Sequence, residues 1–136
     1  MRRRIRLLIA VFSAVIVLSM TVTPALAESY VSTISGFWNT LTGSCRTYHG
    51  TGIHIQLTTT TRSGDDGKYT ISVYRCSGGS ISTLVGGAGT CDYEGFCGYG
   101  WSIALNGLQY AFYFKKTGGD YHDIIDSSSV QMWSTG

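Results

Sequence analysis

Apolar and polar residues alternate along several segments of this sequence, and this period of two constrains the fold more than any other feature. Ile53, Ile55 and Leu57 alternate with polar residues, and the same pattern recurs from Tyr69 to Val73. Successive side chains of a β-strand point to opposite faces of a sheet, so each segment offers one face to a core and one to solvent. The pattern predicts half-buried strands.

The composition agrees with a fold made of strands. The chain has 18 glycines and one proline, Pro24, and is rich in Thr, Val and Ile, which suit a pleated surface, while Gly suits turns. About seven strands at this spacing predict an all-β fold, either an antiparallel β-sandwich or a small barrel. Further strands are expected at residues 30–35, 37–41, 80–85, 121–126 and 130–133.

Two β-hairpins are expected. The Asn106-Gly107 pair favours the positive φ angles of a two-residue type I′ turn. It would pair residues 100–105 with residues 108–114, with Trp101 opposite Phe112. In the second hairpin, residues 53–58 would pair with residues 69–74 across a polar turn.

The first 27 residues have the layout of a secretory signal peptide. Four arginines precede an apolar run from Leu7 to Val22, and Pro24 leads into the small residues that end at Ala27. The run is shorter than the roughly 20 apolar residues that span a bilayer. Cleavage after Ala27 would release residues 28–136 as one secreted β domain with no membrane anchor. The ordinary export route is favoured, and the paired arginines leave twin-arginine export open.

Removal of the signal peptide changes the charge balance. Four of the ten basic residues lie in it, which leaves six against eight acidic residues, a net charge of −2. Because no basic stripe remains to hold a phosphate backbone, nucleic acid is not expected as a partner.

The four cysteines all lie in the expected secreted domain. An even number of cysteines in a small exported chain predicts two disulfides, whereas a zinc site would need close pairs such as C-x2-C. Three connectivities are possible. The pairing Cys45–Cys76 with Cys91–Cys97 is favoured, because the second pair brackets a Gly-rich segment that a local cross-link would order.

No catalytic, metal-binding or cofactor-binding residue is predicted. Among His49, His54 and His122, only His122 has an adjacent acid, Asp123, and neighbouring strand residues point to opposite faces. Glu94 lies in no recognisable ribonuclease motif. Two groups of aspartates lack the alternate spacing of a calcium loop and are expected to be solvated turn residues; they are Asp65 and Asp66, and Asp120, Asp123 and Asp126.

Two segments are candidate partner-binding surfaces. Residues 85–99 are expected to form a Gly-rich cystine loop that exposes Tyr93 and Phe96 as anchors, although either ring could instead fold back and cap the sandwich. The segment after Ala27 carries Tyr30, Val31 and Ile34. It could add as a strand to a partner's sheet, or it could be the first strand of this domain.

The layout resembles small secreted β-domain proteins of actinobacteria, among them the adaptor subunit of umbrella-shaped antibacterial toxin particles. The resemblance rests on the signal ending at Ala27, the single Gly/Ser/Thr-rich domain with paired cysteines, and strands such as residues 52–57 and 101–105. It implies a short exported protein that joins a lectin-bearing subunit to a toxin-bearing stalk.

These observations together favour a non-enzymatic protein-binding module that is secreted and binds another secreted protein. An adaptor in an extracellular antibacterial toxin complex is the sharpest form of this hypothesis. A small secreted hydrolase-type toxin is an alternative, which would need His122 or His54 to face an acid across a cleft. A secreted protease inhibitor is another, because a cystine loop could present a bond to a protease.

Overall fold

The computed structural model describes residues 27–119 and 122–136, and this part of the chain is an all-β domain. The expected signal peptide lies outside the described residues except for Ala27. Within the described residues, no helix has the length and apolar character that crossing a membrane requires. The strands are β1 (Ser29–Phe37), β2 (Thr40–Thr42), β3 (Arg46–Tyr48), β4 (Gly52–Thr61), β5 (Gly67–Ser77), β6 (Ser80–Asp92), β7 (Gly95–Ser102), β8 (Leu108–Gly119) and β9 (Ile125–Thr135).

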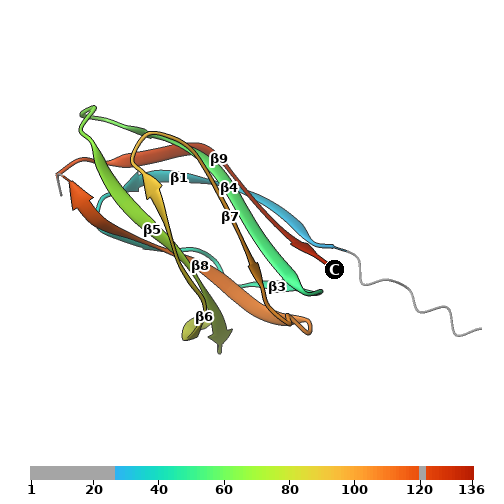
Figure 1. The fold of residues 1–136 in the computed structure, drawn as a ribbon. Helices are drawn as coiled ribbons and strands as arrows, with labels where there is room; N and C mark the ends of the chain where they lie inside the picture. The colour runs from blue at the N-terminus through green and yellow to red at the C-terminus, as the bar shows by residue number, and fades with distance from the viewer. Residues whose placement is uncertain (1–26, 120–121) are drawn as a thin grey trace, which may run out of the picture.

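The strands form two antiparallel sheets that pack face to face, so the expected β-sandwich is confirmed (Figure 1). Sheet A has the strand order β1-β9-β4-β7. Sheet B has the order β2-β8-β5-β6, with the short β3 also paired to β8. Each sheet therefore contains strands from distant parts of the chain, and β1 and β9, from the two ends of the domain, lie side by side.

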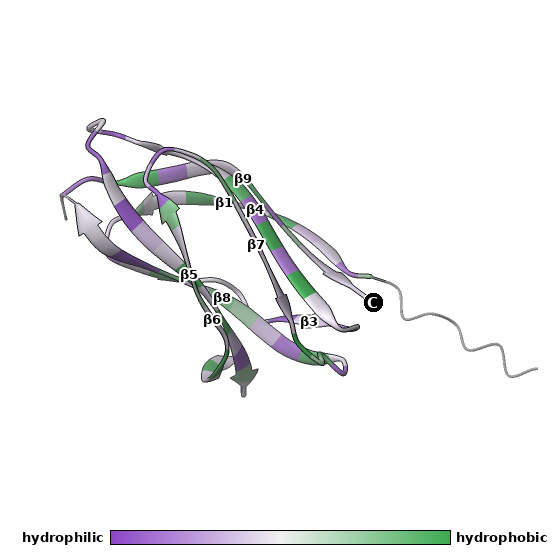
Figure 2. Ribbon diagram, in the orientation of Figure 1, coloured by the Kyte–Doolittle hydropathy of each residue, from purple (hydrophilic) through white to green (hydrophobic). Residues whose placement is uncertain are grey.

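The core lies between the sheets and follows the alternation in the sequence. Ile53 and Ile55 of β4 and Ile71 of β5 are fully buried, and Phe112 of β8 is almost so. Figure 2 shows the alternation as green and purple bands along β4. Burial of each such side chain contributes roughly 1.5–3 kcal/mol, so the inward faces of β4, β5 and β8 hold the two sheets together.

The prediction of a hairpin around Asn106 is wrong, although the turn itself forms. Asn106 and Gly107 have φ angles of 54° and 69°, and the Leu108 amide donates to the Leu105 carbonyl at 3.1 Å. However, the turn joins β7 of sheet A to β8 of sheet B. Before the turn, the amides of Ile103 and Leu105 donate to the loop at residues 50–51 instead of to β8, and this carries the chain across the sandwich.

The second expected hairpin is also wrong, because β4 belongs to sheet A and β5 to sheet B. The connection between them is organised by Asp123, which is fully buried. Its carboxylate accepts hydrogen bonds from the amides of Ser63 and Asp65 at 3.1 and 3.2 Å. These bonds direct the chain from one sheet to the other at this point.

Both favoured disulfides are present, Cys45–Cys76 and Cys91–Cys97, with Cα–Cα distances of 6.1 and 5.8 Å. Cys76 lies in β5 and Cys45 leads into β3, and both of these strands pair with β8 from opposite sides. The first disulfide therefore ties the segment before β3 to β5. The second joins β6 at the edge of sheet B to β7 at the edge of sheet A.

Residues 85–99 do not form the expected long loop. Strand β6 continues to Asp92 and β7 begins at Gly95, so only a short turn separates them. Two glycines of this segment, Gly86 and Gly89, lie within β6 for a steric reason. A Cβ on Gly86 would approach the Trp101 ring to 3.0 Å, so glycine gives the indole room against β6.

Candidate functional site

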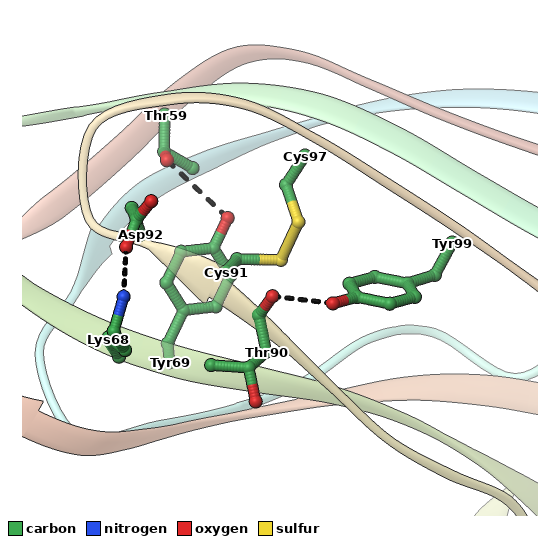
Figure 3. Close-up of a disulfide and its surroundings, with 8 residues drawn as sticks. All are labelled: Thr59, Lys68, Tyr69, Thr90, Cys91, Asp92, Cys97 and Tyr99. Carbon is green, nitrogen blue, oxygen red and sulfur yellow. Dashed lines mark hydrogen bonds and ion pairs between the residues drawn. A yellow bond between two sulfur atoms is a disulfide. The ribbon is translucent and has the colours of Figure 1, made fainter.

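One long side of the sandwich, between β6 and β7, is tightly closed. The Cys91–Cys97 disulfide joins these strands, and the Tyr99 hydroxyl donates to the Thr90 carbonyl at 2.6 Å (Figure 3). Further along, the Trp101 indole N–H donates to the Gly87 carbonyl at 2.8 Å. These cross-links fix the two sheets relative to each other on this side.

The opposite side, between β1 of sheet A and β2 of sheet B, is open. We call this opening the seam. It contains a pocket of about 200 Å³ whose walls are mostly apolar and whose rim carries hydroxyl groups and one cation. The pocket is lined by Ser32, Thr33, Ile34, Leu41, Thr42, Gly43, Ser44, Arg46, Phe112, Phe114, Val130 and Met132. The pocket therefore opens from the seam into the core between the two sheets.

Aromatic side chains close the seam at both ends of the pocket. At one end, the Tyr30 hydroxyl donates to the Thr47 carbonyl at 2.9 Å, and the Arg46 guanidinium lies 4.7 Å from the centroid of the Tyr30 ring. At the other end, the Phe37 ring lies 6.1 Å from that of Tyr69 and 6.2 Å from that of Phe114. The pocket is therefore a bounded hollow with fixed end walls.

Strand β1 borders the pocket, and it has a free edge because, among the strands at residues 27–119 and 122–136, it pairs only with β9 in sheet A. Its edge runs regularly from Ser29 to Ile34, since the register shift between Ser32 and Ile34 places the extra residue in β9. A bulge follows in β1 itself, where Gly36 has a φ of 81°. β1 contains no Lys or Pro, which are common protections of exposed edges.

The start of β1 is anchored by Glu28. Its carboxylate accepts a hydrogen bond from the His49 amide at 2.8 Å, another from the Ser134 hydroxyl at 2.8 Å, and one from the His49 ring. Burial opposes ionisation, but the bonds from His49 and Ser134 outweigh it and lower the pKa of Glu28 to about 2. The free edge therefore begins from a fixed point.

The five predicted partner-binding residues do not form one surface. Tyr30 is half-buried and Ile34 lies in the pocket wall, whereas Val31 is 66% exposed on β1. Phe96 is 71% exposed on β7, at the far edge of sheet A. Tyr93 is only 1% exposed, so the expectation that it is an exposed anchor is wrong; its ring folds back, with the Lys116 ammonium 4.9 Å from the ring centroid.

The pocket in the seam was not predicted from the sequence. Its lining comes from segments around residues 32, 42, 112 and 130, which no local pattern brings together. The only signal was the alternation of single apolar residues with polar ones, such as Val130 and Met132, and that alternation also describes an ordinary closed core. The open seam depends on β2 and β3 being short, and three-residue strands give little sequence signal.

The histidines and Glu94 lie apart from the seam pocket. His49 contacts Glu28, and His54 stacks on Trp133 with ring centroids 5.3 Å apart. Glu94 accepts a hydrogen bond from Thr61 at 2.7 Å. His122 is exposed, whereas its neighbour Asp123 is buried with its carboxylate bound to main-chain amides. Among residues 27–119 and 122–136, no three His, Cys, Asp or Glu side chains are grouped to hold a metal ion.

Two of the acids expected to be solvated have structural partners instead. Asp126 accepts two hydrogen bonds from the Arg62 guanidinium, at 2.8 and 2.9 Å, and one from the Gly36 amide at 2.9 Å. Asp123 is buried and orders the connection between β4 and β5. Turn composition alone could not reveal these roles, because the donors are about 60 to 90 residues away in the sequence.

A larger hollow of about 690 Å³ lies at the end of the sandwich beside the turn between β6 and β7. Its lining includes the ion pair between Lys68 and Asp92, which appears in Figure 3, and Glu94, which is hydrogen-bonded to Thr61. These three charged groups already have partners within the domain, and Asp66 is the remaining charged residue of the lining. The seam pocket, with its apolar walls and free strand edge, is therefore the better candidate site.

No protein family matches this chain, and no curated protein or solved structure is similar to it.

Proposed function

We propose that this chain is a secreted, non-enzymatic module that binds an extended segment of another secreted protein at the seam. The observation that carries the proposal is the free edge of β1 directly beside an apolar pocket. An extended peptide can add to such an edge, where main-chain hydrogen bonds provide affinity and alternate side chains provide specificity.

The pocket size favours a side chain over a whole small molecule. Pockets for small ligands commonly measure about 300–1,000 Å³. The seam pocket, at about 200 Å³, is smaller than this range. An apolar side chain of the added strand would enter it, while the next side chain along would point to the outer face of sheet A beside Val31.

The positive charge at the pocket rim favours a partner segment that carries a negative charge. Arg46 is the only charged residue that lines the pocket, and within the described residues no carboxylate forms an ion pair with it. A partner segment with an acidic residue next to its apolar anchor would complement this guanidinium. The closed side between β6 and β7 keeps the two sheets in place. This domain therefore loses little conformational entropy when the segment binds.

The two disulfides and the expected signal peptide support an extracellular location for this module. Two disulfides are consistent with an extracellular protein. The signal peptide expected at residues 1–27 supports secretion, and the resemblance in layout to toxin-particle adaptors supports a role as an adaptor subunit of an extracellular antibacterial complex. The location of the histidines and Glu94 outside the seam pocket supports a function that involves no catalysis.

The test is capture of a partner by the mature protein, residues 28–136, from culture supernatant. Thr42→Lys places a charged chain at the pocket rim, and Thr83→Lys is its matched control, since Thr83 is an exposed strand residue on β6. We expect a stoichiometric partner that Thr83→Lys retains and Thr42→Lys loses, with slower hydrogen exchange in β1 on binding. Equal capture by both variants, or no protection of β1, would refute binding at the seam.

A further inference from the structure

The outer face of sheet A is almost free of charge. Strands β1, β4 and β7 contain no Asp, Glu, Lys or Arg, and the one such residue in β9, Asp126, is paired with Arg62. The face instead presents aromatic rings, amides and glycines. A surface of this kind offers no counter-charge to a nucleic acid or an acidic polymer.

Two glycines on β7 allow aromatic rings to lie flat on this face. A Cβ on Gly98 would stand 3.3 Å from the tip of the Phe96 ring, and one on Gly100 would stand 2.5 Å from His54 Nδ1. The rings therefore lie over the glycines, as aromatic side chains do when they cover edge glycines of a sheet. Phe96 remains 71% exposed, so one face of its ring is open to solvent.

An amide pair lies between the aromatic groups. Gln56 Nε2 donates to Gln131 Oε1 at 2.6 Å, across β4 and β9. Each amide has two N–H donors and a carbonyl acceptor, so this bond leaves further donors and acceptors directed at solvent. Beyond the pair, Trp133 and His54 stack with an interplanar angle of 10°.

Two shallow hollows meet at Gln56. One, of about 210 Å³, lies toward Phe96 and Gln131, and the other, of about 230 Å³, lies toward His54, Gly100 and Trp133. The surface is thus a continuous strip across β7, β4 and β9, with an aromatic group at each end and amides in the middle. We call it the sheet A platform.

We propose that the sheet A platform binds a neutral polysaccharide. The C–H faces of sugar rings carry slight positive charge and match the negative face of an aromatic ring such as Phe96. Hydroxyl groups both donate and accept, as the amides of Gln56 and Gln131 do. The absence of charge complements an uncharged glycan, and the two hollows accommodate successive units of a chain. Protein hot spots, by contrast, favour deep and well-packed pockets.

The platform lies on the outer face of sheet A, whereas the seam pocket opens between the two sheets, and the two approach each other where Gln131 of β9 pairs with Val31 of β1. Phe96 lies on β7 at one edge of sheet A, whereas β1 forms the other edge. A module of this form could hold a protein partner at the seam and a glycan surface at the platform at the same time. The glycan proposal does not depend on the identity or existence of the protein partner.

The test is native affinity electrophoresis of the mature protein through gels that contain hydroxyethyl cellulose, xyloglucan, galactomannan or dextran, with dextran sulfate as the charged comparison. We expect retardation by at least one neutral polysaccharide. Phe96→Ala and Gln56→Ala should each weaken it by about tenfold or more, the equivalent of about 1.4 kcal/mol. Phe96→Tyr should retain it, as should Leu84→Ala, which removes an exposed apolar side chain from β6 in sheet B.

Several outcomes would overturn the proposal. They are retardation by none of the neutral polysaccharides, retardation by dextran sulfate alone, and equal binding by wild type and Phe96→Ala. Loss of a captured protein in Phe96→Ala, with no glycan bound by the wild type, would assign the platform to a protein partner instead. Thermal unfolding of each variant would show that the fold is retained.

Discussion

The ring of Tyr99 lies directly against Gly89, so closely that a Cβ on this glycine would stand 2.7 Å from three ring atoms. We therefore expect Gly89→Ala to destabilise the domain by about 1–3 kcal/mol, because the ring cannot move without losing its hydrogen bond to Thr90. Gly87→Ala is the matched control in the same strand. Nothing lies within 4 Å of its added Cβ, and its effect should stay within about 0.5 kcal/mol. Urea unfolding of both variants would measure the difference.

The two disulfides should contribute unequally to stability. Cys45–Cys76 closes a loop with a sequence separation of 31, and Cys91–Cys97 one of 6. Loop-closure entropy predicts about 3.7 kcal/mol for the first and about 2.2 kcal/mol for the second. Cys45→Ala/Cys76→Ala should therefore unfold at lower denaturant concentration than Cys91→Ala/Cys97→Ala. The opposite order would show that the cross-link between sheets matters more than loop length. Unreduced wild type should show no free thiols.

Deletion of residues 28–35 should strongly destabilise the domain. The segment forms most of β1, pairs with β9, and carries Ile34, which is 7% exposed. We expect a loss of at least about 3 kcal/mol, comparable to removal of a large core side chain. Val31→Ala, on the exposed face of the same strand, should change stability by less than about 0.5 kcal/mol. An unchanged melting temperature after the deletion would mean instead that the segment is a detachable arm.

Acid should remove the contribution of Glu28. The pKa of its carboxyl falls from 4.5 to about 2 in the folded protein, so the folded state binds fewer protons than the unfolded state between these values. The stabilisation is complete above about pH 5 and is lost as the pH falls toward 2. Glu28→Gln should be less stable than wild type at pH 7, and the two should converge near pH 2. Parallel curves over this range would contradict the role of Glu28.

Substitution of His49 gives an independent test of the stabilisation by Glu28. His49→Ala loses the ring contact to Glu28 but keeps the main-chain bond from residue 49. We expect it to reduce the difference in stability between pH 7 and pH 2 only in part. Chemical denaturation at a series of pH values would measure both variants.

The sequence identified most of the longer strands and their inward faces but not their partners. It missed the short β3, and the strand expected at residues 37–41 is wrong, because the chain bends at residues 38–39 between β1 and β2. The alternation of Ile53, Ile55 and Leu57 placed all three in the core, where they are buried. The Asn106-Gly107 turn also formed, yet it joins two sheets. Trp101 and Phe112 meet as expected, with centroids 6.0 Å apart, but across the sandwich instead of within one sheet. Period-two patterning fixes the face of a residue and carries no information on which strand lies beside it.

The candidate site was less predictable than the fold. Val31 and Phe96 are exposed as a binding residue must be, but Tyr93 is buried under the chain that surrounds it. The segment around Tyr93 was expected to be a loop because of its glycines. Gly86 and Gly89 instead make room for Trp101 and Tyr99, a reason that depends on residues brought in by another sheet. Steric fit of this kind is a property of the assembled sandwich.

The pairing of β1 with β9 sets how the domain responds to mechanical force. Ser29 lies opposite Trp133, so the start of β1 and the end of β9 are neighbours, and neither strand contains a cysteine of the two disulfides. The hydrogen bonds of an antiparallel pair lie perpendicular to the strands. A force that pulls these two neighbouring points apart therefore acts along the hydrogen bonds and breaks them one at a time, starting at the pulled end. Strands β1 and β9 would separate at low force. The segments between Cys45 and Cys76 and between Cys91 and Cys97 would not lengthen, because each disulfide holds the ends of its segment together.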